Sequence, residues 1–314
     1  MKLLRQPQER KLTEIVTSYI ARDLYLLAIN SRIPTIEDYI KLFSVSRGTV
    51  QNAIANIKSA KGATLSGKGV AGAYIMEKNP DILLEMSGRS HFMGGCGIPQ
   101  TKPLIAITSA LYLSAKEDIT ISYVQGAQRR IKSLLAGKLD FIVASFLAGK
   151  ELQNEYGQSL TIAKQLANKS YLTGYNLLIR KDIDIKEIKK IGFDPKSPDY
   201  RIITRKFFPE DKYTMVHMHY SSLPTALRNG KIDACIFNRD IAETMSEKID
   251  YDKWGIAIKE LDFKNMEMEK VTRAVIICSK DDYRTADFIR DNFDWEKLEK
   301  SRKAVLDDAI LPIL

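Results

Sequence analysis

Apolar positions near the start of the chain recur with the period of an amphipathic helix. Six of them share one helical face and predict a first helix over residues 8–29: Leu12, Ile15, Val16, Tyr19, Ile20 and Leu24. The run "TIEDYIKLF" predicts a second, shorter helix, with Thr35 as its N-cap and Asp38 at the capping-box position. The first segment of the chain is therefore expected to be helical.

A third helix is predicted directly after the second, with Ser46 as its N-cap. Its residues Val50, Ile54 and Ile57 form one apolar stripe, which we expect to face the core. Two short helices joined by a turn of about three residues are typical of a helix-turn-helix. Recognition helices present their N-terminal end to base edges, where Arg favours guanine and Gln or Asn favours adenine. The expected DNA contacts are Ser46, Arg47, Thr49, Gln51 and Asn52.

Two strand-like runs, "ATL" and "AYIM", follow this helix and flank the segment "SGKGVAG". This pattern predicts a β-hairpin with a flexible basic tip. Lys68 and Gly69 at the tip are expected to lie near a DNA phosphate or in the minor groove.

From about residue 80, strand-like runs alternate with helical runs in the order β-α-β-α-β. The first such unit covers residues 90–145 and the second covers residues 190–238. The order predicts an α/β fold with parallel sheets and right-handed crossovers. Extended runs over residues 159–166, 171–181 and 269–280 would join the two units, and the chain would end in helices.

Two stretches of this second part are almost alike: "LLAGKLDFIV" at residues 134–143 and "LRNGKIDACI" at residues 227–236. Each predicts a helix end, a Gly in the left-handed cap position and a strand. The Lys after each Gly would lie at the negative end of the helix. We interpret the repeat as one helix-to-strand junction present in both of two α/β lobes.

The motifs resemble two known families. "SVSRGTVQNAI" followed by "GKGVAGAYI" resembles the winged helix-turn-helix of GntR-type bacterial regulators over residues 35–76. A chain that crosses twice between two α/β lobes resembles the type 2 periplasmic-binding-protein fold. A GntR-like head on this body resembles the YhfZ-type transcription regulators. The resemblance implies a double-stranded DNA operator as a partner and a small-molecule effector between the lobes.

Composition and charge support a division into two domains. The chain has 314 residues and a net charge of +9, and its first 78 residues hold twelve Lys and Arg against six Asp and Glu. An excess of positive charge draws such a module to a polyanion. We predict a DNA-binding domain over residues 1–78 and a two-lobed effector-binding domain over residues 79–314. A basic solvated surface, or a helix pair used only for packing, is the alternative for the first domain.

Candidate ligand residues follow from the predicted sheets. In open α/β sheets, ligands bind beyond the carboxyl ends of the strands, at helix N-termini. Arg239 could hold a carboxylate or phosphate through two hydrogen bonds. The expected contacts to a small polar or anionic effector are Gln100, Thr101, Gln125, Gly126 and Ser145 in the first lobe, and Asp194, Ser197, Ser221, Ser222, Asn238 and Arg239 in the second.

Other features bear on location and partners. The sequence shows no apolar run of the roughly 18 residues that a membrane span needs, no signal-peptide core, and no catalytic or phosphate-loop motif. Cys96, Cys235 and Cys278 are far apart, as expected for buried thiols in a reducing cytoplasm. We expect no cofactor, no metal and no membrane partner.

The sequence therefore predicts a cytoplasmic DNA-binding transcription regulator rather than an enzyme. A homodimer is expected, because one small head reads too little sequence for useful specificity. Two alternatives remain at this point: a transferase on the same two-lobed fold, and a binding protein that delivers a solute and would need export.

Overall fold

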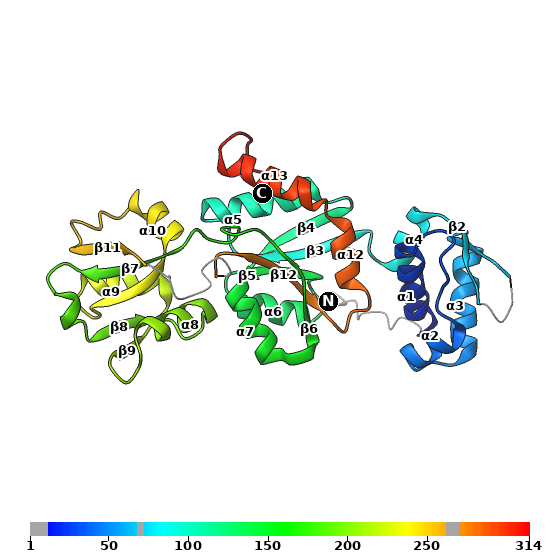
Figure 1. Cartoon of the computed structure of the whole chain (residues 1–314), viewed down its shortest axis with the longest axis horizontal. Helices are drawn as coiled ribbons and strands as arrows, with labels where there is room; N and C mark the ends of the chain where they lie inside the picture. Colours follow the sequence, from blue (N-terminus) through cyan, green and yellow to red (C-terminus); the bar gives the residue numbers. More distant parts are fainter. Residues whose placement is uncertain (1–11, 68–71, 262–270) are drawn as a thin grey trace, which may run out of the picture. The chain divides into compact units, whose positions relative to one another are not determined.

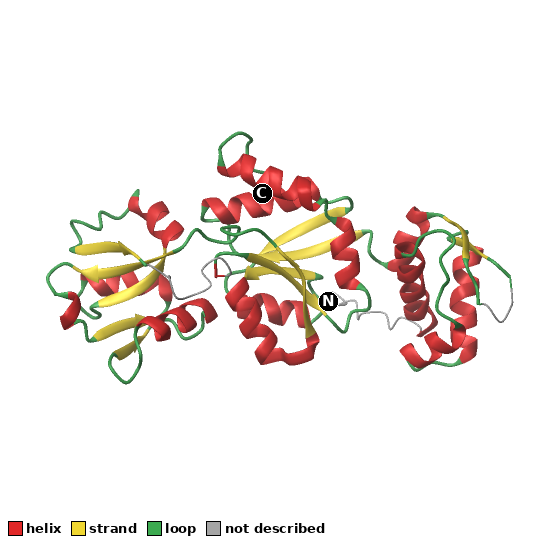
Figure 2. Ribbon diagram, in the orientation of Figure 1, coloured by secondary structure: helices red, strands yellow, loops and turns green. Residues whose placement is uncertain are grey.

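The computed structural model describes residues 12–67, 72–261 and 271–314. These form two compact units. We call the first the head, which is the chain up to Phe92 together with Asp282–Phe288; the second, the body, is Met93–Asp281 and Ile289–Leu314. Figures 1 and 2 show the elements of each unit.

The head is a winged helix-turn-helix. Its elements are α1 (Leu12–Leu26), α2 (Ile36–Phe43), α3 (Arg47–Ser59), the antiparallel strands β1 (Ala63–Leu65) and β2 (Ile75–Lys78), and α4 (Pro80–Ser87). Both predicted caps are confirmed: Thr35 and Asp38 form a capping box on α2, and the Ser46 side chain accepts a hydrogen bond from the backbone N–H of Thr49. The predicted hairpin is confirmed as β1 and β2, and its tip lies outside the described residues.

The first helix ends at Leu26, earlier than the predicted residue 29. Its last carbonyls have another partner, because the Lys78 ammonium donates to the carbonyl oxygens of Tyr25 and Leu27, both at 2.6 Å. A cation at a helix C-terminus also interacts favourably with the helix dipole. The predicted beginning of this helix, at residue 8, lies outside the described residues.

The head extends beyond the predicted boundary at residue 78. Helix α4 packs on α1, and Leu83 of α4 is fully buried in the same apolar core as Ile20 and Val50. The head also contains the segment Asp282–Phe288, which is distant in the sequence. Both additions depend on tertiary contacts that a linear boundary does not show.

The body has two lobes, as predicted. Lobe one has the strand order β4-β3-β5-β12-β6. Its strands are β3 (His91–Cys96), β4 (Asp118–Tyr123), β5 (Phe141–Ser145), β6 (Leu160–Gln165) and β12 (Ala274–Ser279). Its helices are α5 (Lys102–Ser114), α6 (Ala127–Leu135), α7 (Phe146–Tyr156), α13 (Trp295–Leu306) and the end of α12 (Thr285–Asn292). Helices lie on both faces of this sheet (Figure 2).

Lobe two has the strand order β11-β7-β10-β8-β9. Its strands are β7 (Tyr175–Arg180), β8 (Lys190–Phe193), β9 (Thr214–His217), β10 (Ala234–Asn238) and β11 (Ile256–Glu260). Its helices are α8 (Pro198–Phe207), α9 (Leu223–Arg228) and α10 (Arg239–Ser246), with the short 3-10 turns η2 (Ile185–Glu187) and η3 (Tyr220–Ser222); a further 3-10 turn, η1 (Gly157–Ser159), joins α7 to β6 in lobe one. The chain enters lobe two between β6 and β7 and returns to lobe one between β11 and β12.

The repeated turn is confirmed as the same junction in both lobes. Gly137 follows α6 with a φ of 68°, and Gly230 follows α9 with a φ of 65°. These are left-handed conformations, which glycine adopts without a steric penalty. The Asp after each turn also accepts a hydrogen bond from the neighbouring parallel strand: Asp140 from the Met93 N–H and Asp233 from the Lys190 N–H, both at 2.8 Å. The repeat therefore fastens the third strand of each lobe to its first strand.

No helix in the described part of the chain is long and apolar enough to cross a membrane.

Candidate functional sites

The predicted DNA-reading residues lie together at the beginning of α3. Arg47, Gln51 and Asn52 are exposed, whereas Val50 and Ala53 of the same helix are fully buried. Ser46 contacts Thr49 through both hydroxyls (2.8 Å between the oxygens). The helix therefore presents its polar N-terminal side outward, as expected. Lys68 and Gly69 lie outside the described residues.

Arg47 has a partner that the sequence did not indicate. Its guanidinium forms an ion pair with Glu37 of α2, and the two side chains are 59% and 56% exposed. Exposed ion pairs contribute little free energy, typically 0–1 kcal/mol. The pair holds Arg47 near the start of α3 and can open at low cost when a base or phosphate competes.

A cleft of about 1200 Å3 lies between the two lobes of the body. Seven of the eleven predicted effector residues line it: Gln100, Thr101, Gln125, Gly126, Asp194, Ser197 and Asn238. They come from the loop after β3, the start of α6, the loop after β8 and the end of β10. The strand ends of the two lobes thus meet at one site.

The other four predicted residues are not among the described residues that line the cleft: Ser145, Ser221, Ser222 and Arg239. Ser145 is buried and donates its hydroxyl to the Asp199 carboxylate at 2.7 Å. Arg239 is ion-paired with Glu260 at the end of β11. Its partner is on the edge strand of the lobe-two sheet, so Arg239 already has a counter-ion outside the residues that line the cleft.

Sequence reasoning missed Arg130, which lies in the first turn of α6 and lines the cleft. The residue is only 2% exposed. Its guanidinium donates to the Val124 carbonyl oxygen at 2.7 Å and to the Tyr171 hydroxyl at 3.3 Å. Its Nε has no hydrogen-bond partner, and no described carboxylate lies within ion-pair distance of the guanidinium. The Asp199 carboxylate interacts with Arg130 only through space, and a buried cation without an ion-paired partner is uncommon in proteins.

Three helices begin at the cleft without a side-chain cap. The N-cap residues Thr101 of α5, Gly126 of α6 and Ser197 of α8 all line the cleft, and none accepts a hydrogen bond from its helix. By contrast, the Ser145 side chain caps α7 and the Asn238 side chain caps α10. Free backbone N–H groups at a helix N-terminus favour a negative charge.

Two polar contacts join the lobes beside the cleft. Asp199 at the start of α8 accepts the Ser145 hydroxyl, and Arg201 of the same helix pairs with Glu151 of α7. Burial raises the pKa of Asp199 to about 6, although the hydrogen bond from Ser145 acts in the opposite direction. The carboxylate of Asp199 therefore titrates close to neutral pH.

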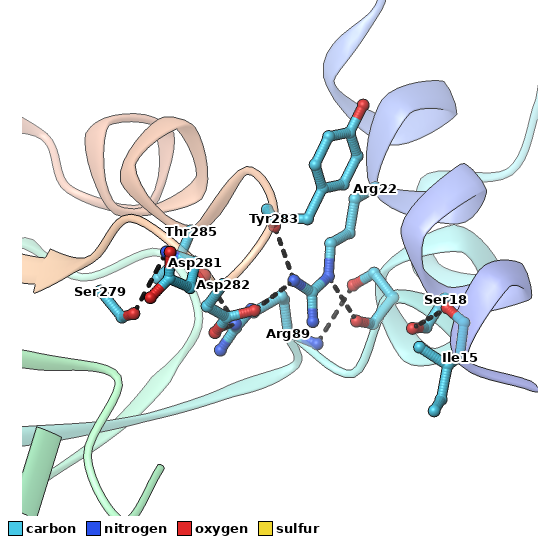
Figure 3. A network of polar contacts seen from close by, with 10 residues as sticks. Ile15, Ser18, Arg22, Arg89, Ser279, Asp281, Asp282, Tyr283 and Thr285 are labelled. Carbon is cyan, nitrogen blue, oxygen red and sulfur yellow. Dashed lines mark hydrogen bonds and ion pairs between the residues drawn. The ribbon is translucent and has the colours of Figure 1, made fainter. Parts of the chain in front are cut away.

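The segment Asp282–Phe288 is held within the head by a cluster of charges around α1 (Figure 3). Arg22 donates to the Asp282 carboxylate at 2.7 Å and to the Tyr283 carbonyl at 2.6 Å, and Arg89 pairs with the same carboxylate. Burial alone would raise the pKa of Asp282, but the two guanidinium groups outweigh it and lower the pKa. We call Arg22, Arg89 and Asp282 the clasp.

A second contact set lies next to the clasp. Asp23 of α1 is fully buried and accepts hydrogen bonds from the Tyr283 hydroxyl at 3.0 Å and from Arg284 at 2.8 Å. Burial raises the pKa of Asp23, and the positive charge of Arg284 opposes this shift. The segment Asp282–Phe288 is therefore part of the packed interior of the head.

Comparison with known proteins places the chain in a family. Residues 80–313 match the family model described as the YhfZ C-terminal domain. The chain belongs to the YhfZ family. Residues 29–75 match a second model, described as a helix-turn-helix domain. The protein YhfZ of Escherichia coli strain K12 is 25% identical over 88% of this chain and 89% of its own length.

Solved structures confirm the fold of the body. The crystal structure of YhfZ from Shigella flexneri superposes with a TM-score of 0.60 at 24% identity and covers 72% of this chain and 94% of that chain. The periplasmic aliphatic sulphonate-binding protein SsuA of Escherichia coli superposes with a TM-score of 0.53 at 11% identity, over 70% and 75% of the two chains. The chain is therefore a helix-turn-helix regulator with a binding-protein-like domain. The predicted fold class is confirmed.

Proposed function

We propose that a small polar or anionic effector binds in the interlobe cleft and changes the affinity of the head for a double-stranded DNA operator. The observation that carries the proposal is the pairing of two sites in one chain. The exposed polar start of α3 suits base edges, and the cleft gathers helix N-termini from both lobes.

The finer features of the proposal follow the same reasoning. The hairpin after α3 favours a GntR-like wing that contacts the DNA backbone. A homodimer would place two such heads on two half-sites, which gives useful specificity. Three buried cysteine thiols favour a reducing cytoplasm as the place of action. The protein would act by binding rather than by catalysis.

The covalent path of the chain supports coupling between the two functions. Strand β12 lies in the lobe-one sheet, next to β5, and receives the chain as it returns from lobe two. Directly after it, the chain runs into the segment that the clasp holds against α1. A change in the arrangement of the lobes can therefore pull on the head through β12. This coupling is allosteric only if the effector binds the two arrangements with different affinity.

Selection of bound duplexes from a random pool, followed by anisotropy titrations, tests the DNA part. Arg47→Ala and Gln51→Ala should each weaken the selected duplex by about 1–3 kcal/mol while leaving random DNA nearly unaffected. Lys58→Ala is the matched control, because Lys58 is exposed at the other end of α3. This control should at most reduce binding to all sequences alike. If selection enriched no duplex, or if all three variants lost the same affinity, Arg47 and Gln51 would not be base-reading residues.

A further inference from the structure

We propose that the lobe-one wall of the cleft is an oxyanion site in which Arg130 and the N-termini of α5 and α6 hold a carboxylate, sulfonate or phosphate group. This inference rests on the proposed function, because it names the chemical class of the effector and the end by which it is held.

Arg130 has no ion-paired partner among the described residues. It is almost completely buried in the cleft wall, where its guanidinium finds only a carbonyl oxygen and a phenol hydroxyl as hydrogen-bond acceptors. The Asp199 carboxylate, which also lines the cleft, attracts it through space but forms no ion pair with it. Burial of an ionised group without an opposite charge costs several kcal/mol. An arginine side chain stays charged in proteins under all ordinary conditions. A bound anion would supply the charge and the acceptor that the site lacks.

The position of Arg130 between the starts of α5 and α6 suits an oxyanion. Arg130 lies in the first turn of α6, whose N-cap Gly126 has no side chain to cap the helix. One of its terminal nitrogens lies 3.7 Å from the position that a Cβ on Gly97 would occupy, in the loop that leads to α5. Both helices are at least nine residues long and begin at the cleft. Arg130 therefore stands between two free helix ends and offers a planar fork suited to an oxyanion.

The Arg130 side chain is held in place before a ligand binds. Its hydrogen bonds to Val124 and Tyr171 hold the guanidinium from two different segments of the chain. A side chain that is already ordered loses little further entropy on binding. Its unpaired Nε shows that these contacts do not satisfy it completely.

Lobe two lacks an equivalent of the Arg130 site. The repeated turn aligns Arg130 with Leu223, because both residues lie seven positions before the left-handed Gly. The register of the first strand with the third aligns Gly97 with Asp194. At these positions lobe two has Leu223, which is buried in its apolar core, and the carboxylate of Asp194 at the cleft, where lobe one has a guanidinium and a glycine. An anionic group would face lobe one, and the rest of the ligand would face Tyr200 and Tyr220, whose rings are stacked at 5.7 Å.

The test uses the full-length protein and four probes: sulfate, phosphate, methanesulfonate and acetate, each compared with chloride at equal ionic strength. Thermal melts and calorimetric titrations are recorded for wild type, Arg130→Leu, Arg130→Lys and Arg239→Gln. Arg130→Leu installs the residue of lobe two, and Arg239→Gln is the control, because that arginine is already paired with Glu260.

We expect at least one oxyanion to raise the melting temperature of wild type and of Arg239→Gln beyond the effect of chloride. Arg130→Leu should lose this excess and weaken the affinity by at least about thirtyfold, the fold-change typical of removing one partner of a desolvated charge pair. Arg130→Lys should retain part of it, because the charge remains and the fork is lost. Circular dichroism checks that each variant is folded.

An equal excess in Arg130→Leu, or no excess in wild type with any of the four anions, would overturn the oxyanion site. The duplex obtained by selection separates this outcome from failure of the proposed function. Oxyanion binding without any DNA binding would contradict the regulator and leave the site intact. DNA binding without an Arg130-dependent excess would contradict the site and leave the DNA-binding head intact.

Discussion

The two lobes of the body share one architecture and differ in the chemistry of their cleft walls. The strand order is the same in both lobes. It is β4-β3-β5-β12-β6 in lobe one and, read in the same direction, β9-β8-β10-β7-β11 in lobe two. The Gly and Asp of the repeated turn are also the same. The helix before the repeated turn differs, however: seven positions before the Gly, lobe one has Arg130 in α6 and lobe two has Leu223 in α9.

This difference teaches that the fold and the binding site depend on different residues. Gly137 and Gly230 and the two aspartates repeat because each junction needs a left-handed cap and a fastened strand. The residue in the first turn of the helix differs, because Arg130 lines the cleft whereas Leu223 packs into an apolar core. This position therefore places a positive charge in the lobe-one wall of the cleft and an apolar side chain in the core of lobe two.

The largest expected effect comes from placing the lobe-one residue in lobe two. Leu223 is 1% exposed and lies in an apolar core with Ile232 and Phe237. Leu223→Arg should lower the free energy of unfolding by about 3–5 kcal/mol, because a charge would be buried without a partner. Chemical denaturation measures the change. Leu223→Met, which nearly conserves volume, is the control and should cost less than about 1.5 kcal/mol. A well-folded, equally stable Leu223→Arg variant would show that the two positions are not distinct environments.

The next effect tests what the lobes share. Asp233 accepts hydrogen bonds from the N–H groups of Lys189 and Lys190, at 3.0 and 2.8 Å, and Asp140 accepts one from Met93. Asp233→Ala should cost about 1–3 kcal/mol, since backbone donors lose their acceptor. Asp140→Ala should cost the same or less. Denaturation of these variants beside Asp233→Asn, which retains an acceptor oxygen, checks the expectation. A neutral Asp233→Ala would mean that the repeated aspartate does not fasten the strands.

The smallest expected effect concerns the contact between the lobes. The pKa of Asp199 is raised to about 6, above its value in the unfolded chain, because of burial. The protonated form is therefore favoured in the folded state. The stability from this group is fully present below pH 4 or so and is lost as the pH rises through about 6. The loss should be about 1–2 kcal/mol, since the side chain is only partly buried.

Melting curves between pH 4 and pH 7 measure this contribution. Asp199→Asn should not show it, because the amide does not titrate in this range. Glu151→Gln serves as a control on the neighbouring interlobe pair with Arg201. If wild type and Asp199→Asn lost stability in parallel over this range, the titration would belong to other groups.

Much of the head was predictable because its signals are local. The Thr35–Asp38 capping box and the Ser46 cap each connect residues three apart, and α3 shows its apolar stripe within a few turns. The head also contains features that no local pattern indicates. Helix α4 and the segment Asp282–Phe288 belong to it only because Leu83, Arg22 and Asp23 find their partners there after folding.

In the body, the sequence by itself determined the two-lobed order of strands and helices, since the alternating pattern and the repeated Gly-Lys-x-Asp are written along the chain. Only the tertiary structure decided which arginine faces the cleft. Arg239 follows the end of β10, as a ligand residue should, but it pairs with Glu260 of β11, two strands away, and does not line the cleft. Arg130 has the sequence context of an ordinary helical arginine, yet packing places it beside Gly97 and Tyr171 with no ion-paired partner among the described residues. The direction of a long side chain depends on the charges that folding brings near it, and those come from segments far apart in the sequence.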